Sequence, residues 1–569
     1  MPRSQKPSPP DAAGAPGPPR GDGGRGAIFT RREVADFILD LVGYSADRPL
    51  YEKRLLEPSF GGGDILLPAI GRLLASWRAN GAGIGPLRGA IRAVESHGPT
   101  FGATRLAIVG FLRDRGLGAG DAEGLADAWL APGDFLLTPL EGEFDFAVGN
   151  PPYVRHELIP NGLMAEYRRR YGTIHDRADI YVPFIERSLG LLSRGGSLGF
   201  ICPNRWVKNR YGAPLRSLVA KNFHLRVFVD MEDRPAFRST VTAYPAIVVI
   251  DRARPGPTRV ARGPQISAPE LSALAKTLNA GEPPGEGDPA RELPVVGNGP
   301  EPWLLEPPGP TALIRRLERG FPTLGEAGCQ VGVGVATGAD KAFIGDFEDL
   351  DVEPSRKLRL LTTGDIASGE VRWGGLGVIN PFDETGRLVD LRDHPRLGRY
   401  LGERRETLAK RHCAKKNPAS WYRTIDRIDL GLYKSPKILM PDIKAKAHAV
   451  FEAGGFYPNH NIYHVTSRAW DLRALQAVLS SAVAGMFVSA YAVAMRGGFL
   501  RFQAQYLRRI RLPLWADVPG RLRRELAGAA MARDLAACDQ AAFELYGLSP
   551  GERDELRAHS AQPGSRPLP

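Results

Sequence analysis

The residues that could most directly carry out chemistry are Asn150-Pro151-Pro152-Tyr153, a turn that follows the apolar run Phe144–Val148. That run predicts a buried strand. The asparagine offers a side-chain carbonyl, the first proline adds no competing backbone donor, and the tyrosine offers a flat face for stacking. The turn is therefore suited to accept hydrogen bonds from a planar amino group while a methyl group is delivered. The alternative interpretation is a proline-capped strand end.

A second motif, Glu57-Pro58-Ser59-Phe60-Gly61-Gly62-Gly63, runs from a predicted strand into a glycine-rich turn. Glycines let the backbone approach a ligand closely, and Glu57 could bind an amine or a hydroxyl group. The spacing differs from the dinucleotide fingerprint, and no lysine follows as in a phosphate loop. The turn therefore favours a nucleoside that carries an amino acid over a phosphate group.

Two further acidic residues follow at intervals that suit a nucleoside site. Glu95 ends the next predicted strand, where an acidic side chain can bind ribose hydroxyls. Asp134, in Gly133-Asp134-Phe135-Leu136, could accept a hydrogen bond from the amino group of an adenine ring. The alternatives are a solvated strand end for Glu95 and an ordinary helix N-cap for Asp134.

Short apolar runs alternate with helical patterns between Leu55 and Ile250, which favours a mostly parallel sheet with helices on both faces. Ligands of such sheets bind at the carboxyl ends of the strands. Upstream, Thr30 and Glu33 form a capping-box pattern for a helix that ends at Gly43. The strand candidates are Arg54–Glu57, Ala90–Glu95, Phe144–Gly149, Ser197–Cys202, Leu225–Val229 and Ala246–Ile250.

The composition is that of a basic, globular, multidomain protein. The 569 residues are 43% hydrophobic, and the formal net charge of +12 favours a polyanionic partner, most simply nucleic acid. No run of about 18 apolar residues predicts a membrane span. The cysteines have no zinc spacing and are expected to be reduced thiols in the cytoplasm. They are Cys202, Cys329, Cys413 and Cys538.

Composition also predicts the boundaries along the chain. Residues 1–26 are rich in proline and glycine and predict a disordered tail rather than a signal peptide. An ordered region is expected over 27–252, and a linker region over 253–310 with a short helix near Ala268–Leu278. A second ordered region is expected over 311–515. A helix at Gly520–Tyr546 and a polar tail complete residues 516–569.

Taken in order, these motifs resemble the gamma class of DNA adenine amino-methyltransferases of restriction–modification systems. The first helix, the glycine turn, Glu95, Asp134 and the Asn150 turn fall where the cofactor, ribose, adenine and catalytic motifs of that family fall. Further similar segments are Asp179–Tyr181, Phe200–Trp206, Phe237 and Phe543–Leu548. The likeness is strong over 28–251 and thinner over 332–513. One departure is Phe60-Gly61-Gly62-Gly63-Asp64, where the family more often has a small residue, glycine, a hydroxyl residue and glycine.

The resemblance implies an α/β fold: a Rossmann-like S-adenosylmethionine-dependent methyltransferase domain with a mostly parallel sheet, followed by a mixed α+β target-recognition domain. The side-chain carbonyl of Asn150 and the main-chain carbonyl of Pro151 would accept the two hydrogens of an adenine amine. The base would leave the duplex and stack on Tyr153 and Phe237. Core packing is the alternative for Phe237. The residues implied to bind S-adenosylmethionine are Thr30, Glu57, Ser59, Gly61, Gly63, Glu95 and Asp134.

A basic stretch between Glu403 and Lys437 is the predicted DNA-binding segment. It holds ten Lys/Arg against four Asp/Glu, with aromatic residues interleaved, a composition typical of phosphate and base contacts. A solvated basic helix face is the alternative. A second cluster lies at Arg496, Arg501, Arg508, Arg509 and Arg511. The residues expected to bind DNA are Lys415, Lys416, Trp421, Arg423 and Arg501.

Other functions remain open at this point. A protein-glutamine or RNA methyltransferase could use the same turn, because a glutamine amide is also a planar amine. A non-catalytic DNA-binding component is a further alternative. Pro441-Asp442 with Lys444 is too incomplete for a nuclease core, and the N-terminal tail is too short for a nuclease domain. We therefore expect a methylase without cleavage activity or a metal site, located in the cytoplasm of a bacterial or archaeal cell, for which a separate restriction endonuclease could be a partner.

Overall fold

The computed structural model describes residues 28–561 except 82, 232–233, 239–243, 286, 297–298, 306–307 and 493–498. The chain divides into two compact units, Met1–Leu305 and Glu306–Pro569. The predicted tail at residues 1–26 and Arg496 lie outside the described residues. Each unit has buried apolar clusters of its own, so each is described separately.

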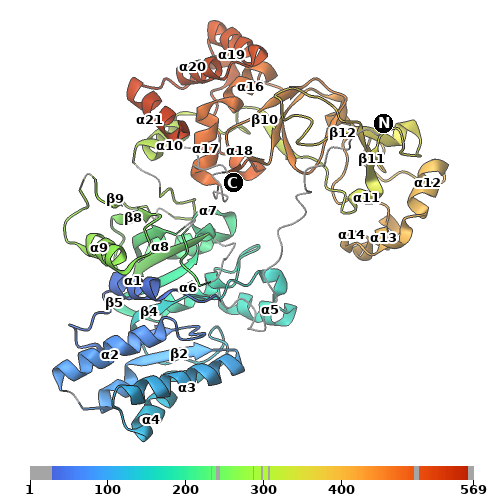
Figure 1. Ribbon diagram of the computed structural model, residues 1–569. Coiled ribbons are helices and arrows are strands. Elements are labelled where there is room, and N and C mark those ends of the chain that lie inside the picture. The colour runs from blue at the N-terminus through green and yellow to red at the C-terminus, as the bar shows by residue number, and fades with distance from the viewer. Residues whose placement is uncertain are drawn as a thin grey trace, which may run out of the picture. The chain divides into compact units, whose positions relative to one another are not determined.

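The first unit is built on one nine-stranded sheet (Figure 1). Its strands are β1 (Leu55–Glu57), β2 (Ile91–Glu95), β3 (Leu130–Pro132), β4 (Phe144–Gly149), β5 (Leu192–Pro203), β6 (His224–Asp230), β7 (Pro245–Asp251), β8 (Thr258–Arg262) and β9 (Ala290–Leu293). Their order across the sheet is β3-β2-β1-β4-β5-β7-β6-β8-β9. The first five of these run parallel, and β7 is antiparallel to both its neighbours. The sequence therefore located six strands correctly and missed β3, β8 and β9.

Helices cover both faces of this sheet. They are α1 (Arg32–Val42), α2 (Leu66–Asn80), α3 (Gly98–Asp114), α4 (Ala119–Trp129), α5 (Asn161–Arg170), α6 (Tyr181–Gly190), α7 (Arg205–Lys208), α8 (Ala213–Asn222) and α9 (Ala268–Asn279). Successive strand residues point to opposite faces: Leu55 joins the cluster beneath α1, α2 and α9, whereas Leu56 joins the cluster beneath α6 and α8. Both faces of the strands are buried, which explains their continuous apolar runs.

Two predictions for this unit are wrong. The region expected to be a linker, residues 253–310, contains β8 and β9, which extend the sheet beyond β6, and α9, which packs in the same apolar cluster as α1. Only the short helix within it was expected.

Thr30 does not cap the first helix, because α1 begins at Arg32 after Arg31 and has no side-chain cap. The helix ends at Gly43 as expected, with Gly43 in the left-handed conformation at φ 75°.

The second unit contains two four-stranded sheets and a two-stranded sheet. Its strands are β10 (Cys329–Val333), β11 (Ile344–Asp346), β12 (Lys357–Leu361), β13 (Leu376–Ile379), β14 (Lys437–Pro441), β15 (Ile443–Lys444), β16 (Val450–Glu452), β17 (Tyr457–Pro458), β18 (Ile462–Ser467) and β19 (Leu500–Arg501). The sheets have the orders β10-β18-β14-β16 and β11-β13-β12-β17, and β15 pairs with β19. This mixed α+β architecture agrees with the expectation for the second half of the chain.

Helices complete this unit (Figure 1). They are α10 (Pro308–Gly320), α11 (Asp340–Phe343), α12 (Pro395–Gly402), α13 (Arg405–Ala409), α14 (His412–Lys416), α15 (Leu430–Lys434), α16 (Leu472–Ser480), α17 (Ala482–Tyr491), α18 (Ala504–Leu507), α19 (Gly520–Ala532), α20 (Leu535–Leu545) and α21 (Pro550–Ala561). The single helix expected over Gly520–Tyr546 is broken between α19 and α20, where Arg533 adopts a left-handed conformation and Asp534 caps α20. Part of the expected polar tail is α21.

Among the described residues, no single helix is long and apolar enough to cross a membrane. The helices α16 and α17, bent by 60° at their junction, meet the criteria of length and composition only as a pair.

Candidate active site

Four polar residues lie at or just beyond the carboxyl ends of four neighbouring parallel strands. Across the order β3-β2-β1-β4, these residues are Asp134, Glu95, Glu57 and Asn150. Glu57 pairs with Ala93 in β2, and Glu95 pairs with Pro132 in β3. This register places the ends of the three strands at the same edge of the sheet. The topology thus brings together residues that are spread over 94 positions of sequence, from Glu57 to Asn150 inclusive.

These residues line one cavity of about 480 Å³ in the first unit. The glycine-rich turn after β1 and the Asn150 turn after β4 form its walls, and residues Ile28–Thr30 contribute a further side. Of the sequence-predicted catalytic and cofactor residues, all but Gly63 and Tyr153 line it. Those that do are Thr30, Glu57, Ser59, Gly61, Glu95, Asp134, Asn150, Pro151 and Pro152.

The side-chain amide of Asn150 has a defined orientation. Its Nδ2 donates to the main-chain carbonyl of Ile28 at 2.9 Å and to the hydroxyl of Thr30 at 3.3 Å. A main-chain carbonyl can only accept, so the nitrogen side of the amide must face Ile28. The opposite atom, Oδ1, is buried and has no hydrogen-bond partner among the described residues. Asn150 lines the cavity, and its side-chain oxygen is therefore an acceptor that a ligand could use.

Glu57 is the most deeply buried acidic group of the cavity, with 2% of its surface exposed. Its Oε2 has no hydrogen-bond partner within the described part of the chain. Burial, and then the negative charges of Asp64 and Glu95, raise the pKa of Glu57 well above its ordinary value. A cationic or hydrogen-donating ligand would relieve this cost, because it would supply the missing partner.

Glu95 is held in place by backbone donors on two sides. Its Oε2 accepts from Gly61 N at 3.0 Å and its Oε1 accepts from His97 N at 2.7 Å. The carboxylate thus joins the end of β2 to the glycine turn after β1. A carboxylate can accept more than two hydrogen bonds, so capacity remains for a ligand hydroxyl.

Asp134 caps a turn, not a helix, and also lines the cavity. Its Oδ1 accepts from Leu136 N at 2.9 Å, as a turn-capping aspartate does, and its Oδ2 accepts from the hydroxyl of Tyr167. Tyr167, on α5, was not identified from the sequence, and a lone tyrosine on a basic helix gives no signal of this contact.

The glycine turn is shaped by hydrogen bonds that hold it to its neighbours. Gly63 N donates to Phe60 O at 2.7 Å, and the φ of 80° at Gly63 explains the need for glycine there. Thr104 on α3 donates to Gly61 O at 2.7 Å. Ser59 Oγ donates at 3.2 Å to the main-chain carbonyl of Asn150. Ser59 therefore connects the glycine turn directly to the Asn150 turn.

The two aromatic candidates lie against each other beside the cavity. The rings of Tyr153 and Phe237 meet edge to face, with centroids 6.1 Å apart. Phe237 is buried, with 6% of its surface exposed. The Tyr153 hydroxyl donates to the main-chain carbonyl of Ile201 at 3.4 Å. Burial, and then nearby Cys202, raise the pKa of Tyr153. Neither ring is among the residues that line the cavity.

The DNA-binding candidates lie in the second unit and differ in how free their charges are. Lys415 and Lys416 are exposed on α14, and neither side-chain ammonium group has a hydrogen bond or an ion pair in the described part of the chain. Trp421 packs in the apolar cluster of α12 and α13, with Arg405 over its ring at 5.1 Å. Arg423 donates to the carbonyls of Thr424 and Ile425. The two lysines are therefore the candidates best placed to bind phosphate.

The second arginine cluster is largely engaged within the protein. Arg501 forms an ion pair with Asp442, with Nε 3.3 Å from Oδ1. Arg508 donates to Val331 O at 2.7 Å, and Arg509 lies over the ring of Tyr491 at 5.0 Å.

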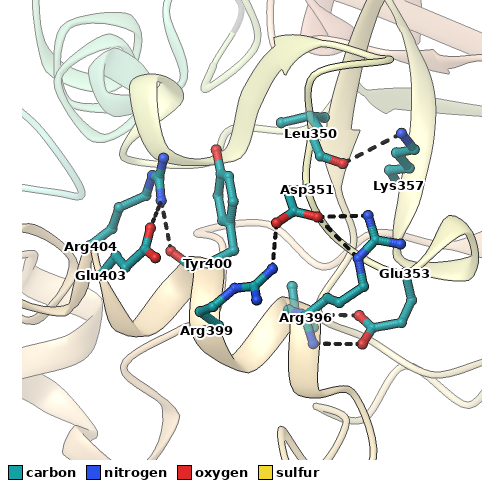
Figure 2. A network of polar contacts seen from close by, with 10 residues as sticks. Leu350, Asp351, Glu353, Lys357, Arg396, Arg399, Tyr400, Glu403 and Arg404 are labelled. Atoms are coloured by element: carbon teal, nitrogen blue, oxygen red, sulfur yellow. Dashed lines mark hydrogen bonds and ion pairs between the residues drawn. The ribbon is translucent and has the colours of Figure 1, made fainter.

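The arginine side chains of α12 also have carboxylate partners, as Figure 2 shows. Asp351 accepts from Arg396 at 2.7 Å and from Arg399 at 2.5 Å. Glu353 accepts from the backbone N–H groups of Arg396 and Leu397, which holds the start of α12. The arginines of α12 thus differ from the lysines of α14 in having carboxylate partners.

Comparisons with known proteins agree with this description. A family model described as Eco57I restriction-modification methylase matches residues 125–237, and one described as TaqI-like C-terminal specificity domain matches residues 395–514. The chain is 65% identical over 535 residues to the type II methyltransferase M.PaeR7I of Pseudomonas aeruginosa, covering 94% of this chain and 93% of the relative. It is 53% identical over 538 residues to the type II methyltransferase M.XhoI of Xanthomonas vasicola, covering 93% and 98%.

Among solved structures, the type IIL restriction-modification enzyme MmeI in complex with DNA matches with a TM-score of 0.59 at 11% identity, covering 94% of this chain and 76% of that one. This likeness concerns the fold alone.

The sheet order, the cavity at the strand ends and the second unit together define a class I methyltransferase fold joined to a specificity domain. Within that class, the chain belongs to the type II methyltransferases of restriction–modification systems. It is a DNA methyltransferase, which confirms the expected fold class and the expected methylation of DNA and sets aside the protein, RNA and non-catalytic alternatives.

Proposed function

We propose that this enzyme transfers a methyl group from S-adenosylmethionine to the exocyclic N6 amine of adenine in duplex DNA. The observation that carries the proposal is the unpartnered Oδ1 of Asn150, whose amide nitrogen is held by Ile28 and Thr30. An adenine amine needs such an acceptor, because its lone pair is delocalised into the ring. Accepting its hydrogens at fixed positions favours tetrahedral geometry and makes the nitrogen more nucleophilic.

A second acceptor is the main-chain carbonyl of Pro151, the next residue of the turn. Proline cannot donate through its nitrogen, so Pro151 and Pro152 bring no backbone N–H that would compete for these acceptors. The turn positions and polarises the amine, and positioning supplies much of the rate enhancement. No covalent intermediate on the protein is required.

The remaining cavity residues fit S-adenosylmethionine, which would supply the electrophilic methyl group. The unpartnered Oε2 of Glu57 suits a cationic or hydroxyl donor, and the glycine turn allows close approach of a ligand to the backbone. Glu95 suits ribose hydroxyls, and Asp134 suits an adenine amino group. Thr30, Ser59 and Gly61 complete the lining.

The target base has to leave the duplex to reach this cavity, at a cost of a few kcal/mol. Tyr153 directly follows the residues that line the cavity and meets Phe237 edge to face. We assign both rings to the flipped base, whose stacking would offset part of that cost.

In the specificity domain, Lys415 and Lys416 would bind the phosphate backbone, with Trp421, Arg423 and Arg501 as further contacts. The enzyme would protect cytoplasmic DNA from a separate restriction endonuclease.

The test is to express the chain in a methylation-free bacterial host and to sequence the genomic DNA by a single-molecule method that detects modified bases. The expected result is N6-methyladenine within one sequence context. Methylation of cytosine N4 instead, at a defined context, would overturn the adenine assignment while leaving the DNA methyltransferase function intact.

A further inference from the structure

A short N-terminal segment, Ile28–Arg31, forms one side of the cofactor cavity and is called the strap below. It pairs with the residues around Phe237: Thr30 forms an antiparallel bridge with Phe237, Arg31 N donates to Ala236 O at 3.1 Å, and Arg238 N donates to Phe29 O at 2.9 Å. Thr30 is 1% exposed. The strap is therefore a fixed part of the fold.

The strap determines how Asn150 faces the cavity. The Ile28 carbonyl and the Thr30 hydroxyl are the two acceptors of the Asn150 amide nitrogen. If the strap moved away, the amide could rotate, and its nitrogen would have no reason to point away from the substrate. The orientation of the proposed catalytic acceptor thus depends on backbone that lies about 120 residues earlier in the sequence.

Asp64 holds the strap from the side of the glycine turn. Its Oδ2 accepts from Thr30 N at 3.0 Å, and its Oδ1 pairs with Arg238 at 2.8 Å. Asp64 thereby contacts both partners of the strap pairing, and its own side chain is largely buried. It immediately follows Gly61-Gly62-Gly63.

We propose that Asp64 is a positioning residue for methyl transfer: it links the cofactor turn to Asn150 through the strap. Asp64 fixes Thr30, and Thr30 with Ile28 fixes the Asn150 amide. The inference rests on the proposed function, because it takes Asn150 as the acceptor of the target amine. A positioning role differs from direct binding of the cofactor by Asp64, which is the competing explanation for an acidic residue in this cavity.

The decisive variants are Asp64→Ala and Asp64→Asn. The alanine variant loses both contacts, whereas the asparagine variant keeps an oxygen for Thr30 N and loses only the charge that pairs with Arg238. We expect Asp64→Ala to lower kcat by about 10- to 100-fold at saturating cofactor and DNA, because a displaced reacting group has an effect of this size. Asp64→Asn should recover most of that loss. Asp114→Ala, on the exposed end of α3, is the matched control.

Cofactor affinity separates the two explanations. Calorimetric titration with S-adenosylmethionine and S-adenosylhomocysteine should give Kd values for Asp64→Ala close to those of the unaltered protein. A Kd raised by about tenfold or more, with kcat unchanged at saturation, would show that Asp64 binds the cofactor directly and would overturn the inference.

A double-mutant cycle tests whether Asp64 acts through Asn150. In an Asn150→Ala background, Asp64→Ala should have no further effect on the single-turnover rate of methyl incorporation, since the group that it positions is gone. Additive effects would overturn the inference. If Asn150→Ala by itself left kcat unchanged, the proposed function would fail instead, so the two failures are distinguishable.

Thr30 provides a second route should Asp64→Ala not fold. Thr30→Val removes the hydroxyl acceptor but keeps the backbone pairing, and Thr30→Ser restores the hydroxyl. We expect Thr30→Val to lower kcat severalfold with an unchanged melting temperature, and Thr30→Ser to recover it. An unchanged kcat in Thr30→Val, together with an unchanged kcat in Asp64→Asn, would contradict the link.

Discussion

At the scale of single residues, the fold uses one end of the Asn150 amide and leaves the other end for a ligand, under the proposed function. The nitrogen donates to Ile28 and Thr30, and the oxygen has no partner among the residues that the structure describes. A buried acceptor without a partner is destabilising by about 1–3 kcal/mol, so its persistence at a cavity points to a ligand that completes it.

Asn150→Ala should lower kcat by about 10²–10³-fold or more, the effect of removing one preorganised hydrogen-bonding group at a reaction centre. Cofactor affinity should change little, because Asn150 is assigned to the target amine. The measurements are single-turnover methyl incorporation and calorimetric cofactor titration. An equal loss of cofactor binding and activity would contradict the assigned role, and Asn222→Ala on the surface of α8 serves as control.

The raised pKa of Glu57 makes a prediction about stability. The folded, unliganded protein favours the protonated carboxyl, so this stabilisation is fully present below the ordinary glutamate pKa and is lost as the pH rises through the raised pKa. Glu57→Gln mimics the protonated form at all pH values. The free energy of unfolding of Glu57→Gln should therefore depend less on pH in that window and exceed that of the unaltered protein at its upper end.

Urea unfolding over a pH series, without cofactor, measures this difference. Cofactor affinity of Glu57→Gln should fall at the same time, since the charge available to a cationic ligand is gone. A Glu57→Gln variant that follows the same pH dependence as the unaltered protein would show that Glu57 is ionised in the unliganded fold.

At the scale of elements, the contrast between α12 and α14 decides where phosphate can bind. Both helices carry two cationic side chains, but Asp351 neutralises Arg396 and Arg399, whereas Lys415 and Lys416 lack such partners among the described residues. Exposed ion pairs contribute little to stability, so the network on α12 is of interest mainly for the charge that it removes.

Lys415→Ala with Lys416→Ala should weaken binding of duplex DNA of any sequence and reduce the slope of log K against log salt by about 2, which is roughly 0.9 for each lost phosphate contact. Arg396→Ala with Arg399→Ala removes the same formal charge and should have a smaller effect. Fluorescence anisotropy at several salt concentrations gives both slopes. Equal slopes for the two double variants would place the phosphate contact elsewhere.

The elements that the sequence did not reveal were short or lay among turn-forming residues. β3 has three residues, and its apolar signal merges with the end of α4. β8 and β9 lie in a stretch so rich in proline and glycine that it predicts a linker, yet pairing with β6 and with each other secures both. Tertiary pairing can override local composition in this way.

At the scale of the whole molecule, the division into two compact units, each with its own apolar clusters, predicts two unfolding events. The cavity at the strand ends, to which we assign the cofactor, is built entirely from residues of the first unit. Calorimetry should therefore show two transitions, with S-adenosylhomocysteine raising the temperature of one. A ligand at about 100 times its Kd stabilises the state that binds it by about 2.7 kcal/mol. A single transition, or an equal shift of both, would show that the units unfold as one.

The alternation of strands and helices, the order of the motifs and the chemistry open to each motif could be predicted from the sequence, because these depend on local residue types and spacing. Glu57, Glu95, Asp134 and Asn150 could all be named in advance, since each lies at or just beyond the end of an apolar run. The folded chain was needed to see that the four meet at one cavity, which oxygen of which residue is already engaged, and that Ile28 and Thr30 hold the Asn150 amide. Hydrogen bonds between residues 120 positions apart leave no periodic trace in a sequence. They form because the segment Ile28–Arg31 pairs with the residues around Phe237 and so lies beside the turn that follows β4.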